Sequence, residues 1–164
     1  MTTQLSAHFT LEELTHSDTA VAHGIANSPT PEHLANAKNW TVPGMELLRH
    51  LLGDSAINVH VAYRNPEVNE LVGGTATSAH PEFFAVDFDR PGETPRTTAT
   101  RIAGFMKQGL IHIDQLILER APGRVVHVSF DPRGAKPGQP SRARGMMGYQ
   151  PGGPGTPIDW GFFK

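Results

Sequence analysis

The sequence predicts an α+β fold in which helices pack on one face of a small antiparallel sheet. Capped helical segments dominate the first half of the chain, and short alternating segments rich in β-branched residues follow them. Two of these segments are separated only by a short turn that contains Pro and Gly. The predicted strands are residues 57–63, 85–89, 114–119 and 124–130.

The helices are predicted from their start and stop signals. Thr10 precedes Leu-Glu-Glu-Leu, so its hydroxyl can cap a first helix. Pro31 opens a second helix that runs to Gly53, and Pro43 should kink it or divide it into two pieces. A short helix is expected in residues 65–74, and another in residues 95–108.

The chain divides by composition after residue 130. Residues 1–130 carry the predicted helices and strands, whereas residues 131–164 form an extension dense in Gly and Pro. We interpret this extension as partly ordered and not as a second domain. Its last apolar segment, residues 158–164, either docks back on the body of the protein or serves a partner.

Composition excludes several classes of function. The 164 residues carry a net charge of −2, whereas a nucleic-acid-binding protein needs a basic face. No apolar run is long enough for a membrane span, and the first residues do not resemble a signal peptide. Cysteine is absent, so a bound metal would need His, Asp or Glu ligands.

Three such ligands lie beside or within the predicted strands. His80 ends a loop, Asp87 lies inside the strand 85–89, and His127 lies on the second arm of the hairpin. Two imidazoles and one carboxylate leave the fourth position of a tetrahedral zinc ion open for water. Zinc lowers the pKa of such a water to about 7, so hydroxide becomes available at neutral pH. The sequence therefore predicts one zinc ion at His80, Asp87 and His127.

Residues 61–89, VAYRNPEVNELVGGTATSAHPEFFAVDFD, resemble the zinc D-Ala-D-Ala carboxypeptidase and L-Ala-D-Glu endopeptidase family, which shares its fold with the Hedgehog signalling domain. The family motif is S-x-H-x-x-G-x-A-x-D, and a downstream strand carries the last ligand, often as W-x-H. Ser78, His80, Ala85 and Asp87 match the motif. The likeness covers roughly residues 5–130 and looks closest to the C-terminal peptidase domains of phages and bacteria.

The resemblance implies roles for two further residues near the motif. Arg64 looks like the residue that holds or polarises a substrate carbonyl or carboxylate, although it could instead pair with Glu67 or Glu70. Ser78 looks like a second polar contact to substrate, although it could simply cap a turn.

The general base of the family is usually a Glu or Asp three residues before the last His ligand. That position holds Arg124, which cannot accept a proton, so Glu119 is the nearest candidate. If residue 115 pairs with residue 127, then residues 115, 117 and 119 share the metal-facing side of the hairpin. A shift by one residue would turn Glu119 away and leave it a solvated charge.

Two further positions depart from the family pattern. Phe83 replaces the motif Gly, and it would strain the loop if that position needs a positive φ, or it could narrow the cleft. Val125 or Val126 replaces the Trp that is usual near the last ligand, which removes an aromatic wall.

The resemblance implies a zinc metallopeptidase that hydrolyses a peptide bond in the peptidoglycan stem or cross-link. The alternative is a zinc-stabilised module that binds cell wall, or a structural part of a virion, without cutting. Because no signal peptide is visible, we expect an endolysin-like bacteriophage enzyme that stays in the host cytoplasm until holin-type release, or one carried by the virion with virion partners.

Overall fold

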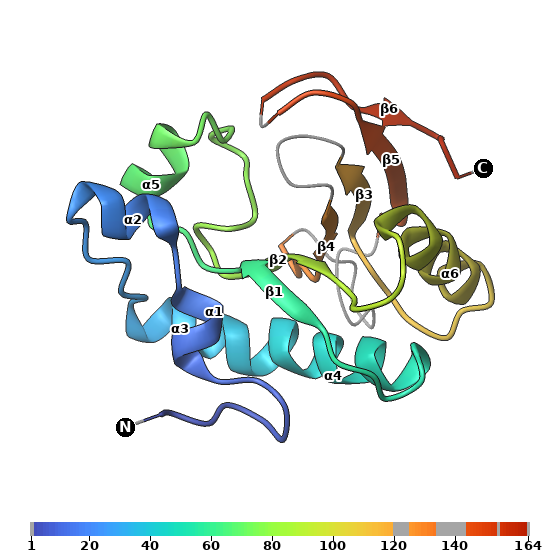
Figure 1. Ribbon diagram of the computed structural model, residues 1–164, viewed down its shortest axis with the longest axis horizontal. Coiled ribbons are helices and arrows are strands. Elements are labelled where there is room, and N and C mark those ends of the chain that lie inside the picture. Colours follow the sequence, from blue (N-terminus) through green and yellow to red (C-terminus); the bar gives the residue numbers. More distant parts are fainter. Residues whose placement is uncertain (1, 120–124, 134–143, 154, 164) are drawn as a thin grey trace.

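A computed structural model describes residues 2–119, 125–133, 144–153 and 155–163. Its helices and strands form one α+β arrangement around a single sheet (Figure 1). The helices are α1 (Leu11–Thr15), α2 (Asp18–His23), α3 (Pro31–Asn36), η1 (Ala37–Thr41), α4 (Val42–Leu51), α5 (Pro66–Leu71) and α6 (Pro95–Lys107). The strands are β1 (Asn58–Val61), β2 (Ala85–Asp89), β3 (Gln115–Glu119), β4 (Val125–Ser129), β5 (Met146–Gln150) and β6 (Asp159–Trp160). Among the described residues, no helix has both the length and the apolar character that crossing a bilayer requires.

The sheet has six strands in the order β1-β2-β4-β3-β5-β6. The predicted fold class is confirmed, but the sheet is not antiparallel throughout, because β5 runs parallel to β3. Asp114, just before β3, accepts a hydrogen bond on its backbone oxygen from the backbone N–H of Met146, so both strands start at the same edge. In the sheet β3 lies between β4 and β5, and the connection from β4 to β5 is long enough for the crossover that places β5 parallel to β3.

The predicted extension 131–164 contributes β5 and β6 to this same sheet. The guanidinium of Arg144 donates two hydrogen bonds of 2.8 Å to the buried carboxylate of Asp114, which places the start of β5 beside β3. Bidentate pairing of this kind fixes orientation as well as distance. The last apolar residues dock on the body of the protein, since the guanidinium of Arg96 lies over the ring of Phe162, 4.8 Å from its centroid, and the backbone oxygen of Phe163 accepts a hydrogen bond from Lys107 Nζ.

The two faces of the sheet have different chemistry, as the period of two along a strand dictates. One face supplies the hydrophobic core, which includes Met45 and Leu48 of α4 and Ile102 of α6. The strand residues of this core are Val86, Phe88, Leu116, Leu118, Val126 and Val128. The alternate residues of β2, β4 and β3 face the other way, and this second face carries the functional site described below.

The break predicted at Pro43 takes the form of a π-helical segment, η1, which ends directly before α4. Pro43 has no N–H to donate to the backbone four residues earlier. In η1 the spacing widens instead, and the N–H of Val42 donates to the oxygen of Ala37. Helix α4 then starts with Pro43 in its first turn, so the helical segment continues and buries Met45 and Leu48 against the sheet.

Phe83, at the position of the motif Gly, has the left-handed φ of +64° that favours glycine. The side chain does not narrow the cleft, because it is fully buried in the core, with its ring centroid 5.2 Å from that of Tyr63. Left-handed backbone costs a non-glycine residue about 1–2 kcal/mol, whereas truncating a buried Phe to Ala costs about 3–5 kcal/mol. Burial of the ring therefore outweighs the backbone strain.

This balance predicts that, at position 83, glycine is less destabilising than alanine, which is the reverse of the usual order for a residue inside a fold. We expect Phe83→Ala to lower the free energy of unfolding by about 3–5 kcal/mol. Phe83→Gly should lower it by about 1 kcal/mol less, because glycine removes the ring and also relieves the backbone. Urea unfolding of both variants measures the order, and a Phe83→Gly variant less stable than Phe83→Ala would contradict it.

Candidate metal centre and catalytic cleft

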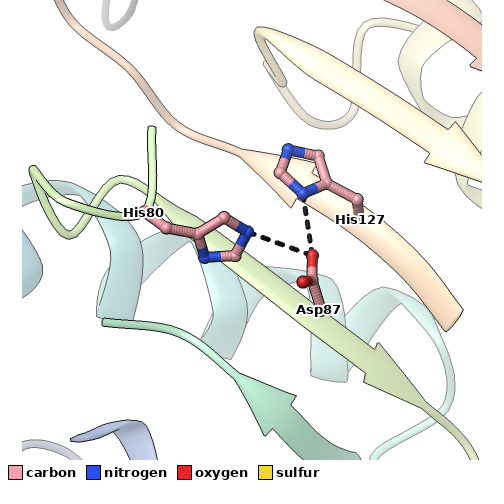
Figure 2. Close-up of side chains that lie close together, drawn as sticks. All are labelled: His80, Asp87 and His127. Carbon is pink, nitrogen blue, oxygen red and sulfur yellow. Dashed lines mark hydrogen bonds and ion pairs between the residues drawn. The ribbon is translucent and has the colours of Figure 1, made fainter. Parts of the chain in front are cut away.

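The second face of the sheet brings His80, Asp87 and His127 together (Figure 2). Asp87 lies in the middle of β2 and pairs across the sheet with His127 of β4, so their side chains emerge side by side. His80 comes from the loop between α5 and β2. All three residues are buried, and one ligand atom from each lies within 4.8 Å of the others.

The ring of His80 has one nitrogen engaged and one free. Its Nδ1 lies 2.7 Å from the backbone oxygen of Ala62, which can only accept, so Nδ1 carries the proton. Its Nε2 therefore carries an unprotonated lone pair. This nitrogen is buried, has no hydrogen-bond partner among the described residues, and points toward Asp87 Oδ1 at 3.3 Å. A backbone carbonyl that fixes the tautomer in this way is the usual support of a metal-ligating histidine.

The Asp87 carboxylate lies between the two imidazoles. Its Oδ1 is 2.8 Å from His127 Nδ1 and 3.3 Å from His80 Nε2. In a tetrahedral zinc site with bonds of 2.0–2.1 Å, two ligand atoms lie about 3.3 Å apart. Asp87 Oδ1 thus already lies at nearly this spacing from both imidazoles, the three ligand atoms lie within 4.8 Å of one another, and the buried lone pair of His80 fits a cation.

The pKa shifts of the three groups agree with a site that suits a cation. Burial raises the pKa of Asp87, but the neighbouring His80 and His127 outweigh it and hold that pKa well below its usual range. Burial lowers the pKa of His80, which keeps the ring neutral. Burial also lowers the pKa of His127, but the hydrogen bond and charge of Asp87 reverse this and raise it. A metal ion that binds His127 through Nδ1 must therefore displace the proton that this nitrogen donates to Asp87.

Arg64 lines the same cleft and is not paired with Glu67 or Glu70 in the described structure. Its Nε is buried and has no hydrogen-bond partner there. Burial lowers the pKa of Arg64, while Asp87 and Glu119 raise it, and a guanidinium stays charged in either case. A half-buried guanidinium with a donor of this kind is suited to an anionic or polarised oxygen of a ligand.

Glu119 faces the cleft, although the predicted register of the hairpin is wrong. Residue 115 pairs with Ser129 and not with His127, and His127 pairs with Ile117. The error is two residues, and because side chains alternate with a period of two, Gln115, Ile117 and Glu119 keep the metal-facing side. Burial raises the pKa of Glu119 to about 7, the charge of Asp87 adds to this, and His127 and Arg64 oppose it.

Ser78 both lines the cleft and supports the loop. Its Oγ accepts a hydrogen bond of 3.3 Å from the backbone N–H of His80, which is the turn-capping role considered from the sequence. Its role toward substrate stays a prediction. Arg124, the residue at the usual base position, and the turn 120–123 lie outside the described residues.

The cleft has a volume of about 270 Å³, and one of its walls was missed by sequence reasoning. The C-terminal residues Gln150, Gly155, Ile158 and Trp160 line it together with the residues above. Composition pointed to an extension, and only the apolar character of residues 158–164 hinted that this segment returns to the body. Val125 and Val126 add no aromatic surface, so Trp160 is the aromatic residue among the described residues of the cleft.

The fold and the site together define a class: an α+β protein with a buried His-Asp-His group in a cleft beside a carboxyl of raised pKa. The family model described as Peptidase M15 matches residues 7–117, and the chain belongs to this family. The match ends before Glu119 and His127. Membership implies a metallopeptidase and suggests a zinc peptidase that acts on peptidoglycan. Comparison with curated proteins gives no match.

Proposed function

We propose that the protein is a zinc metallopeptidase that hydrolyses a peptide bond in the peptidoglycan stem or cross-link. The observation that carries the proposal is the free, buried Nε2 of His80, which faces Asp87 and His127 in a cleft that also contains Glu119. His80, Asp87 and His127 would hold the ion. A zinc ion held there supplies a Lewis acid that polarises the scissile carbonyl and activates water at neutral pH.

The residues of the chain divide the remaining work. Glu119 accepts a proton from the attacking water and returns it to the leaving amine, since a carboxylate with a pKa near neutrality suits both transfers. Arg64 holds a substrate carbonyl or carboxylate with its guanidinium, whose buried Nε has no hydrogen-bond partner among the described residues. Ser78 contacts the substrate from the loop that also carries His80.

The raised pKa of Glu119 predicts the pH dependence of the reaction. As a base it must be deprotonated, so kcat/KM should fall as the pH drops through its pKa. That pKa is about 7 in the protein alone, and a bound cation lowers it by attraction, so the loss should occur below neutral pH. We expect kcat/KM to decline about tenfold per pH unit there. Zinc content measured at each pH is the control, and an activity that stays flat at acidic pH with zinc retained would contradict the role.

The proposed function is tested with purified protein, isolated peptidoglycan and defined stem peptides. The zinc-loaded protein should release new amino groups, and a chelator should abolish the release. Mass spectrometry of the products identifies the bond, and so distinguishes an endopeptidase from a carboxypeptidase.

The alternative, a zinc-stabilised module that binds cell wall without cutting, is favoured by Arg124 at the usual base position. It predicts co-sedimentation with peptidoglycan and no amino groups released under any condition.

The biological setting stays a proposal. An endolysin-like bacteriophage enzyme, released from the host cytoplasm by a holin or carried by the virion with virion partners, would degrade cell wall when applied to intact or outer-membrane-permeabilised bacteria. Detection of the protein in purified particles would favour the virion form, and lysis only on co-expression with a holin would favour the other.

A further inference from the structure

One wall of the cleft is built by a segment that lies outside the matched range of the family. In the parallel pair of β3 and β5, Glu119 is aligned with Gln150 and Ile117 is aligned with Gly148. The metal-facing side of the sheet therefore continues from β3 onto β5. Figure 1 shows β5 and β6 beyond β3 at this end of the sheet.

Gly148 makes room for the side chains that form this wall. A Cβ atom on Gly148 would lie 2.5 Å from Ile158 Cγ2 and 2.9 Å from Trp160 Cε3, both closer than real contacts allow. The indole of Trp160 therefore lies directly over the backbone of β5, next to the position of Ile117. Trp160 remains 40% exposed and is one of the residues that border the cleft.

The wall is held in place along its length. Gly148 pairs with Trp160, and the N–H of Gly161 donates to the oxygen of Met147 at 2.8 Å. The side chain of Gln150 donates to the oxygen of Thr156 at 2.7 Å, which closes the turn between the strands. The turn also approaches the loop before His80, since a Cβ atom on Gly155 would lie 2.9 Å from the oxygen of Gly73. The indole is thus presented on a fixed support.

We propose that Trp160 is a substrate-positioning residue, whose ring packs against the aliphatic part of the stem peptide next to the scissile bond. This inference rests on the proposed peptidase function. The cleft of about 270 Å³ contains both the metal-binding group and Trp160, so the part of a substrate that touches the ring is close to the reacting bond. Ile158 extends the apolar surface, and an aromatic ring with an aliphatic neighbour favours apolar side chains over charged ones. Trp160 would supply the aromatic wall that Val125 and Val126 do not.

The kinetic test compares Trp160→Ala with Trp160→Phe on a soluble stem peptide. We expect Trp160→Ala to raise KM about tenfold while kcat changes less than about threefold, because the contact is made equally in the ground state and the transition state. Trp160→Phe should restore most of the loss. Zinc stoichiometry should match the wild type, since Trp160 is not among the three residues that would hold the metal, and the assay is run below the melting temperature of both variants. An unchanged KM in Trp160→Ala would overturn the proposal.

Two glycine substitutions give a matched test that leaves Trp160 itself intact. Gly148→Ala should displace the indole from the cleft and raise KM in the same way as Trp160→Ala. Gly153→Ala, in the same segment, is the control, because a Cβ there meets nothing within 4 Å and its backbone is not left-handed. A Gly148→Ala enzyme with the KM of the Gly153→Ala enzyme would contradict the placement of the ring.

A binding measurement separates this inference from the proposed function. The chain has two tryptophans, so Trp40→Phe leaves Trp160 as the one reporter of indole fluorescence. In a Trp40→Phe, Glu119→Gln background, stem peptide should shift and saturate the emission. If the wild type hydrolyses nothing, the proposed function fails. The titration still shows whether the stem peptide contacts Trp160. An emission unchanged at saturating peptide would overturn it.

Discussion

Glu119→Gln is expected to lower kcat on peptidoglycan peptides by about 10²–10⁴-fold, which is the range for removal of a general acid-base group. Two carboxylates, Asp87 and Glu119, border the cleft among its described residues, and Asp87 belongs to the group that we propose holds the metal. Glutamine keeps the size of the side chain but cannot accept the proton. Zinc stoichiometry should remain at one per chain.

Glu70→Gln is the matched control for this variant, because Glu70 is an exposed carboxylate of α5 that does not border the cleft. Its kcat should equal that of the wild type. A Glu119→Gln enzyme with wild-type kcat would exclude Glu119 as the base. A Glu119→Gln protein that has lost zinc would instead assign this carboxylate to the metal site.

His80→Ala is expected to abolish both zinc binding and hydrolysis. The substitution removes a buried ring nitrogen that has no hydrogen-bond partner in the described structure and points toward Asp87 at 3.3 Å. We expect zinc affinity to fall by more than about 100-fold, since loss even of a residue that only supports a ligand costs 10- to 100-fold. The stabilisation that zinc confers on the wild type, about 2.7 kcal/mol at a concentration of 100 Kd, should disappear with it.

The matched control is His60→Ala. His60 lies on β1, half exposed, where its Nε2 pairs with Asp89 at 2.6 Å, and it is not among the residues that border the cleft. This variant should bind zinc with wild-type stoichiometry and show the same rise in melting temperature. His80→Ala protein that still binds one zinc per chain and hydrolyses substrate would remove His80 from the site.

Much of the fold was predictable because its signals are local. Thr10 caps α1 by accepting a hydrogen bond from the N–H of Glu13, as the sequence predicts. The alternation of residues predicts β2, β3 and β4, and parity alone keeps Glu119 on the correct face despite a register error of two residues.

The parts that could not be predicted depend on contacts distant in sequence. The parallel pairing of β5 with β3 rests on Arg144 and Asp114, which are far apart in the chain and have no shared local pattern. The glycine-rich composition of the last residues is typical of irregular structure, yet Gly148 is required by the ring of Trp160. Phe83 breaks the family motif, but its side chain is stabilised by a core that only the folded chain contains.

The most direct test of the account is a zinc titration of metal-free protein in the presence of a stem peptide, with bound zinc and released amino groups measured in the same samples. We expect hydrolysis to rise in proportion to bound zinc and to saturate at one ion per chain, and Glu119→Gln to bind zinc equally without this rise. One zinc bound per chain with no amino groups released by the wild type would contradict the proposed peptidase.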